Sequence, residues 1–177
     1  MKTKQNLELK HFCNDFGKIR ETLKKIGAKK DSVKKQKDFF FNLPKKDNGS
    51  KARLKLRIEN KKMTLVYYER EDFVAGKDTS SDILLLEVNK ETFNFLEKSL
   101  GISAIVEKQR EVWRKENTVF HLDTVKDVGM IFEVELQKIG KVTEKDRKIF
   151  LDYQRNLIPF LGKVIKGSNI DLILMKK

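Results

Sequence analysis

The chain has 177 residues, of which 39% are hydrophobic and 37% are charged, so it can fill one core, and we expect a single domain over residues 1–177. Its formal net charge of +13 indicates an anionic partner, such as a phosphorylated small molecule, a nucleic acid or a membrane surface. Cys13 is the only cysteine, which excludes an intramolecular disulfide. No apolar run has the roughly 18–20 residues that span a bilayer, and no signal-peptide pattern opens the chain. We therefore expect a cytoplasmic protein.

The N-terminal half is dominated by strand patterns. Polar and apolar residues alternate from the first segment onward, as expected for strands with two different faces. Asp15 is placed to cap a helix that Gly27 would end, and Asn60-Lys61 is a two-residue hairpin signal. In chain order we predict a strand at about 5–13, a helix at about 16–26, and strands at about 35–43, 51–59 and 62–71.

The C-terminal half contains two further helix patterns. Asn89 is a candidate N-cap, and Thr143 with Asp146 three residues later resembles a capping box. The segment 170–174 fits a helix or a strand equally well. In chain order we predict a strand at about 83–88, a helix from Asn89 to about Gly101, strands at about 102–115, 117–125 and 130–139, and a helix from Thr143 to near Gly162.

These elements amount to about eight strands and three helices, and most of the strands are joined by turns. Strands joined in this way favour an antiparallel sheet. Eight strands are also about the number that closes into a barrel with usable interior space. We therefore expect an α+β fold, an eight-stranded antiparallel β-barrel or tunnel with flanking helices.

Charged residues recur at every second position in four of the predicted strands. Residues i and i+2 of a strand lie on the same face, so each segment collects its charges on one side. One such segment would be an ordinary solvated face, but four of them indicate a shared polar interior that handles ions. The segments are Glu8-Leu9-Lys10, Arg53-Leu54-Lys55-Leu56-Arg57, Lys108-Gln109-Arg110 and Glu133-Val134-Glu135.

The charges on these faces suit a polyphosphate and its metal ions. Arginine offers planar paired donors and lysine a point charge, and both bind phosphate oxygens. Carboxylates among such bases become useful if they hold Mg²⁺ or Mn²⁺, and the combination indicates phosphoryl transfer on a triphosphate-like ligand. The candidate phosphate-binding residues are Lys10, Lys55, Arg57, Arg70, Lys108 and Arg110, and the candidate metal ligands are Glu8, Asp123, Glu133 and Glu135.

Six segments, in order, resemble the motifs of the CYTH superfamily, also called triphosphate tunnel metalloenzymes. The resemblance implies a tunnel that binds a triphosphate with its metals inside, and it implies catalytic roles for Lys10, Arg57, Glu133 and Glu135. The superfamily includes class IV adenylate cyclases, thiamine triphosphatases and inorganic triphosphatases. The matching segments are Glu8-Leu9-Lys10 (the end of ExExK), Gln36 to Phe41 (QxDxYF), Leu54 to Arg57 (LRIR), Val106 to Arg110 (VxKxR), His121-Leu122-Asp123 (hLD) and Gly129 to Glu135 (GxFxExE).

Two positions depart from the family pattern. Asn6 stands where ExExK has its first glutamate, which removes one carboxylate from the implied metal site. Tyr68 stands where the family's LTYKG strand has its lysine, while Arg70 shares the strand parity of Tyr68. Some cyclase-like members look similar at both places. His121, beside the apolar Phe120 and Leu122, is interpreted as a packing residue of its strand rather than a catalytic base.

Three functions are compatible with this pattern. The first is a triphosphatase acting on inorganic, nucleoside or thiamine triphosphate, which needs no dedicated base-recognition pocket. The second is a class IV adenylate cyclase that makes cyclic AMP and pyrophosphate from ATP. The third is a non-catalytic binder of polyphosphate or nucleic acid, which is disfavoured because the strands lack an aromatic platform and carry acids among the bases. We expect no membrane partner and either a monomer or a homodimer.

Overall fold

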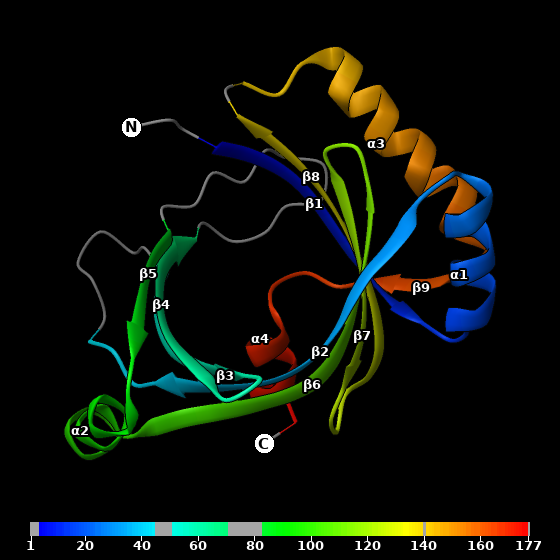
Figure 1. The fold of residues 1–177 in the computed structure, drawn as a ribbon. Coiled ribbons are helices and arrows are strands. Elements are labelled where there is room, and N and C mark those ends of the chain that lie inside the picture. The colour runs from blue at the N-terminus through cyan, green and yellow to red at the C-terminus, as the bar shows by residue number, and fades with distance from the viewer. Residues whose placement is uncertain (1–3, 45–50, 71–82, 140, 177) are drawn as a thin grey trace.

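In the computed structural model, nine antiparallel strands form a strongly curved sheet in the order β5-β4-β3-β2-β6-β7-β8-β1-β9 (Figure 1). The structure describes residues 4–44, 51–70, 83–139 and 141–176. Within these residues the strands are β1 (Lys4–Cys13), β2 (Lys29–Phe41), β3 (Lys51–Glu59), β4 (Lys62–Arg70), β5 (Ile83–Val88), β6 (Ile102–Lys115), β7 (Thr118–Val125), β8 (Gly129–Ile139) and β9 (Leu161–Val164).

Helices lie on both faces of this sheet. The outer core packs α1 and α3 against β1, β7 and β8 through side chains such as Ile19, Phe120 and Leu157. A smaller core on the concave face joins Phe40 and Val106 to α4, which lies inside the curve in Figure 1. The helices are α1 (Phe16–Lys25), α2 (Lys90–Leu100), α3 (Glu144–Leu157) and α4 (Asn169–Leu174), with a 3₁₀ turn at Ile158–Phe160. Within the described ranges, no helix has the length and apolar character that crossing a bilayer requires.

The predicted antiparallel α+β class is confirmed, but the predicted closed eight-stranded barrel is wrong in its closure. In the described part of the chain the sheet has two edges, β5 and β9. β9 pairs with β1 at His11 and Cys13, so it occupies the edge of β1 that closure onto β5 would require. The sheet therefore curves around a central space without a ladder joining its ends.

The local signals for turns and caps are confirmed. Asn60 and Lys61 both have positive φ, 49° and 69°, as a two-residue hairpin of type I′ demands. The Asp15 carboxylate accepts a hydrogen bond from the backbone N–H of Gly17 at 2.8 Å, which caps α1. Asn89 caps α2 in the same way, through the Thr92 N–H at 3.1 Å.

Three boundaries differ from the sequence predictions. β2 begins at Lys29 rather than near residue 35, because its lysine-rich start pairs with β6 from Arg114 onward. α3 ends at Leu157 rather than near residue 162, since Pro159 disfavours helical geometry in the residue before it. The ambiguous tail is helical, and a reciprocal capping box between Ser168 and Asp171 explains its start.

Candidate functional site

The concave face of the sheet encloses a cavity of about 330 Å³. Its lining combines five cationic side chains with four carboxylates, most of them far apart in the sequence. A cavity of mixed charge suits neither an anion nor a cation alone, but it suits a polyanion that arrives with metal ions. The charged lining residues are Glu8, Lys10, Asp38, Lys55, Arg57, Lys108, Arg110, Glu133 and Glu135.

Strand parity and register bring these residues together. On β1, Glu8 and Lys10 face the cavity, while Leu7 and Leu9 belong to the outer core. The antiparallel pairing of β1 with β8 sets Lys10 opposite Glu133 and Glu8 opposite Glu135. The alternation of charges in the sequence thus becomes one continuous ionic surface.

Asp38 on β2 organises two of the cations on β3. Its carboxylate accepts hydrogen bonds from Lys55 Nζ at 2.8 Å and from Arg57 Nε at 2.7 Å and Nη2 at 2.8 Å. Burial alone would raise the pKa of Asp38, but the Arg57 hydrogen bonds and the Lys55 charge outweigh it and hold that pKa below its ordinary value. Burial lowers the pKa of Lys55 to about 7, although the Asp38 charge opposes this. Asp38 was not among the predicted site residues, although it lies in the segment Gln36 to Phe41 that resembles the QxDxYF motif.

Asp123 on β7 has the same relation to two cations on β6. It accepts hydrogen bonds from Arg110 Nε at 2.7 Å and Nη2 at 2.6 Å, and from Lys108 Nζ at 3.2 Å. The side chain of Asp123 is completely buried, and both of its oxygens are used in these bonds. Burial and the neighbouring Arg110 charge lower the pKa of Lys108 to about 8. This geometry orients the two cations, and a metal-binding role for Asp123 stays a prediction.

Glu133 lies between cations from two other strands. Its Oε2 atom is 3.3 Å from Lys10 Nζ and 3.4 Å from Arg110 Nη2. Burial alone would raise the pKa of Glu133, but the charges of Lys10 and Arg110 outweigh it and hold that pKa well below its ordinary value. Lys10 Nζ also lies 3.5 Å from Glu8, so one lysine links two of the predicted metal ligands.

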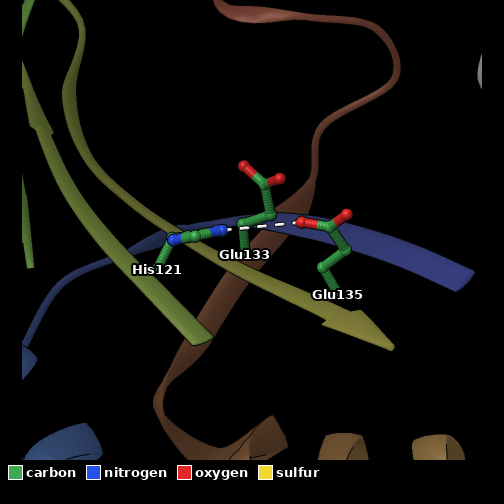
Figure 2. Close-up of side chains that lie close together, drawn as sticks. All are labelled: His121, Glu133 and Glu135. Carbon is green, nitrogen blue, oxygen red and sulfur yellow. Dashed lines mark ion pairs between the residues drawn. The ribbon is translucent and has the colours of Figure 1, made fainter. Parts of the chain in front are cut away.

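His121, Glu133 and Glu135 form a cluster that could hold a divalent metal ion. Figure 2 shows the His121 ring, from β7, directed at the Glu135 carboxylate, from β8, with Nε2 and Oε2 separated by 3.6 Å. One ligand atom from each of the three residues lies within 4.8 Å of the others. Glu8 adds a like charge directly opposite Glu135, an unfavourable cross-strand pair that a cation would relieve. Carboxylate oxygens with an imidazole nitrogen are a donor set that suits such an ion.

The structure changes the interpretation of one residue and shows the partners of another. His121, interpreted from the sequence as a packing residue, contributes its ring to the carboxylate cluster. Arg53 hydrogen-bonds Ser168 and Asp171, the latter at 2.6 Å, and so ties β3 to α4. The side chains of Asn6 and Arg70 lie outside the described part of the structure, so the predictions for these two residues stay predictions.

Comparison with known proteins identifies the family. The model of the CYTH domain matches residues 4–166. The chain belongs to the CYTH family. A protein of Methanocaldococcus jannaschii, named as a candidate adenylate cyclase, is 29% identical over 171 residues, covering 94% of this CYTH chain and 97% of that protein.

Solved structures of similar shape extend this result. The protein PH1012 of Pyrococcus horikoshii OT3 superposes with a TM-score of 0.74 at 26% identity, covering 94% of this chain and 98% of that one. A Hippeastrum protein, named as a candidate adenylyl cyclase and described as having a dominant triphosphatase activity, superposes with a TM-score of 0.67 at 14% identity, covering 98% and 96% of the two chains. The family that the sequence motifs indicated is confirmed.

Proposed function

We propose that this CYTH protein hydrolyses a triphosphate-containing substrate in a reaction that depends on a divalent metal ion. The observation that carries the proposal is the position of His121, Glu133 and Glu135 beside a cavity that five cations also line. Phosphoryl transfer requires both parts, cations that grip the phosphates and a metal at the reacting group. Structural ion pairing alone would not require a histidine and two carboxylates together.

The phosphate-binding part consists of cations that are already oriented. Asp38 holds Lys55 and Arg57, and Asp123 holds Lys108 and Arg110. Side chains fixed before the ligand arrives lose little conformational freedom on binding, so positioning contributes directly to the rate. The proposed phosphate ligands are Lys10, Lys55, Arg57, Arg70, Lys108 and Arg110.

The metal-binding part would use Glu8, Glu133 and Glu135, with Asp123 and His121 at its border. When bound, Mg²⁺ or Mn²⁺ would neutralise charge on the phosphate oxygens and lower the pKa of an attacking water. Lys10 lies within 3.5 Å of both Glu8 and Glu133, so it can move from these carboxylates to a phosphate once their charge is neutralised. The charge of the filled site would then be balanced without further rearrangement of the strands.

A second candidate is adenylate cyclase, which the name of the 29%-identical Methanocaldococcus jannaschii protein favours. The two reactions use the same phosphate and metal sites and differ in the attacking oxygen, which is water in one and the ribose 3′-hydroxyl in the other. The Hippeastrum protein is named as a candidate adenylyl cyclase but is described as having a dominant triphosphatase activity, so a cyclase name does not by itself decide between the two reactions.

The test incubates the protein with ATP, thiamine triphosphate and tripolyphosphate, each with Mg²⁺ or Mn²⁺, and resolves the products. We expect phosphate release that EDTA abolishes and that Glu133→Gln with Glu135→Gln lowers about 100-fold or more, since a metal contributes several kcal/mol to such a transition state. The matched control is Glu107→Gln, which alters a half-exposed carboxylate paired with Lys37 on the same sheet.

Each other outcome selects a different function. Formation of cyclic AMP from ATP in place of phosphate would establish the cyclase. Tight binding of tripolyphosphate or RNA with no turnover of any substrate would establish a polyphosphate or nucleic-acid binder. Equal rates of phosphate release by the double variant and by the Glu107→Gln control would overturn the proposal that Glu133 and Glu135 bind the metal ion.

A further inference from the structure

One wall of the cavity carries no charge. On the cavity side of β4 and β5 lie Val66, Tyr68, Ile83 and Leu85. The antiparallel register sets Val66 opposite Leu85 and Tyr68 opposite Ile83, so the four side chains form one continuous patch, here called the β4–β5 wall. An inorganic polyphosphate gains nothing from such a surface, because it has no apolar part to bury.

Packing within the protein buries Val66, which is 8% exposed, but it does not account for Ile83 and Leu85 on the β4–β5 wall. Phe40, Val106 and Ile170 also line the cavity, but they belong to the inner core that holds α4. None of the four wall residues belongs to either apolar core of the described residues. Ile83 is 53% exposed and Leu85 is 68% exposed, so their apolar surface is available to a ligand. Covering it would be favourable through the hydrophobic effect.

The wall begins where the phosphate-binding cations end. Lys55 Nζ donates to Asp38 at 2.8 Å and also lies 5.8 Å from the centre of the Tyr68 ring. Tyr68 stands at the position where the CYTH pattern has a lysine. The cavity therefore has an aromatic surface where that pattern has a positive charge. A group attached to the end of a phosphate chain would reach that surface directly.

A residue with a buried amide oxygen also lines the cavity. Asn169, the first residue of α4, lines the cavity and is 9% exposed. Its Oδ1 atom accepts no hydrogen bond from the described residues. A buried acceptor without a donor is costly, and a reorientation of the Asn169 side chain toward the cavity would let a ligand that carries an N–H or O–H group satisfy it. A fully ionised tripolyphosphate has no such donor.

We propose that the substrate is an organic triphosphate, in which a planar ring with hydrogen-bond donors lies against the β4–β5 wall and Asn169. Inorganic tripolyphosphate is the disfavoured substrate. The inference rests on the proposed function only in requiring a triphosphate among the cavity cations. ATP and thiamine triphosphate share this chemistry, and the test separates them.

The first experiment measures binding by calorimetry with Ca²⁺ in place of Mg²⁺, so that it does not depend on turnover. We expect ATP or thiamine triphosphate to bind about 10-fold more tightly than tripolyphosphate, the discrimination that a small apolar contact provides. Equal or tighter binding of tripolyphosphate would overturn the inference while leaving the proposed hydrolysis intact. Failure of every compound to turn over with Mg²⁺ or Mn²⁺ would instead overturn the proposed function.

Two pairs of variants locate the contact. Leu85→Ser is expected to weaken organic triphosphate binding about 10-fold and to leave tripolyphosphate binding unchanged. Leu84→Ser is its control, because Leu84 is similarly exposed, at 61%, and is absent from the cavity lining. Tyr68→Lys should shift the preference toward tripolyphosphate, whereas Tyr68→Phe, which keeps the ring, should not. Circular dichroism verifies the fold of each variant. Equal effects of Leu85→Ser on organic triphosphate and tripolyphosphate binding would contradict the proposed contact between the β4–β5 wall and the organic part of the ligand.

Discussion

The two sides of the cavity differ in how deeply their side chains are buried and in whether those side chains are paired with one another. On the side formed by β1, β6 and β8, Glu133 is 7% exposed, and Asp123 on the adjoining strand β7 is 0% exposed. Both carboxylates are held by cations. On the β4–β5 wall, Ile83 and Leu85 are more than half exposed and pack into neither core. A buried ion network resists change because each partner would be left as an uncompensated charge. Our two proposals therefore assign the chemistry to the rigid side and substrate choice to the open side.

The largest expected effect lies on the rigid side, in Asp123→Asn. This change leaves Arg110 and Lys108 buried without their carboxylate, and we expect it to lower the free energy of unfolding by about 3–5 kcal/mol, measured by urea denaturation. Glu107→Gln, which breaks half-exposed pairs with Lys37 and Lys126, should cost less than about 1 kcal/mol.

The same variant tests whether Asp123 is also a metal ligand. An unchanged Mn²⁺ affinity would indicate that Asp123 only orients Arg110 and Lys108. A stability loss no larger than that of Glu107→Gln would contradict the contrast between the two sides.

The next effect concerns His121→Gln and the choice of metal. An imidazole suits Mn²⁺ better than Mg²⁺, so we expect Mn²⁺ affinity to fall about 10-fold or more and Mg²⁺ affinity to fall less. Electron paramagnetic resonance and calorimetry measure the two affinities. His11→Gln is the control, since His11 bonds the Gly162 carbonyl through Nδ1 and is absent from the metal cluster. Losses no larger than those of His11→Gln would show that His121 has no ligand role.

A smaller effect is expected in the pH profile of Lys55→Arg. The pKa of Lys55 is lowered to about 7, so kcat/KM should fall as pH rises through that value and the phosphate-binding charge is lost. An arginine stays charged, so the variant should lose this limb of the profile, whereas Lys37→Arg should keep it. Identical alkaline limbs in wild type and Lys55→Arg would show that another group titrates.

The same lysine affects stability with a defined sign. Its folded pKa of about 7 lies below the ordinary value of 10.5, so between these pH values the unfolded chain binds more protons than the folded chain. The contribution of Lys55 to the free energy of unfolding therefore rises with pH across this window. Urea denaturation at several pH values measures it.

The smallest effect should follow Arg53→Ala, which frees α4 from β3. The lost pair with Asp171 is partly exposed, so we expect a cost of about 1 kcal/mol in unfolding free energy. Because Ser168 and Asn169 line the cavity, KM for an organic triphosphate should rise about 3-fold while kcat is unchanged. A fall in kcat with no change in KM would place Arg53 among the reacting groups instead.

Much of the ionic surface was predictable from strand period alone. The alternation of Glu8 with Lys10, and of Glu133 with Glu135, placed each pair on one face, and the structure puts all four in the cavity lining. Asp38 was missed because a single acid among lysines gives no periodic signal. His121 was missed because its neighbours in the sequence are apolar, and only the pairing with β8 shows which charges it faces.

The open sheet was not predictable for a related reason. β9 has only four residues, with no alternating burial that would mark it as a strand. It exists because β1 offers an unpaired edge at His11 and Cys13, a property of the folded sheet rather than of the segment. The sequence patterns therefore predicted eight strands without β9, and that number favoured a closed barrel.

The sequence by itself determined which residues share a strand face, the balance of bases and acids, and the family motifs, because these depend on a local period of two. Only the tertiary structure decided which charges become partners. The pairing of Glu8 with Glu135, and of Arg110 with Asp123, depends on the register between separate strands. That register is set by packing on both faces of the sheet, which no single segment encodes.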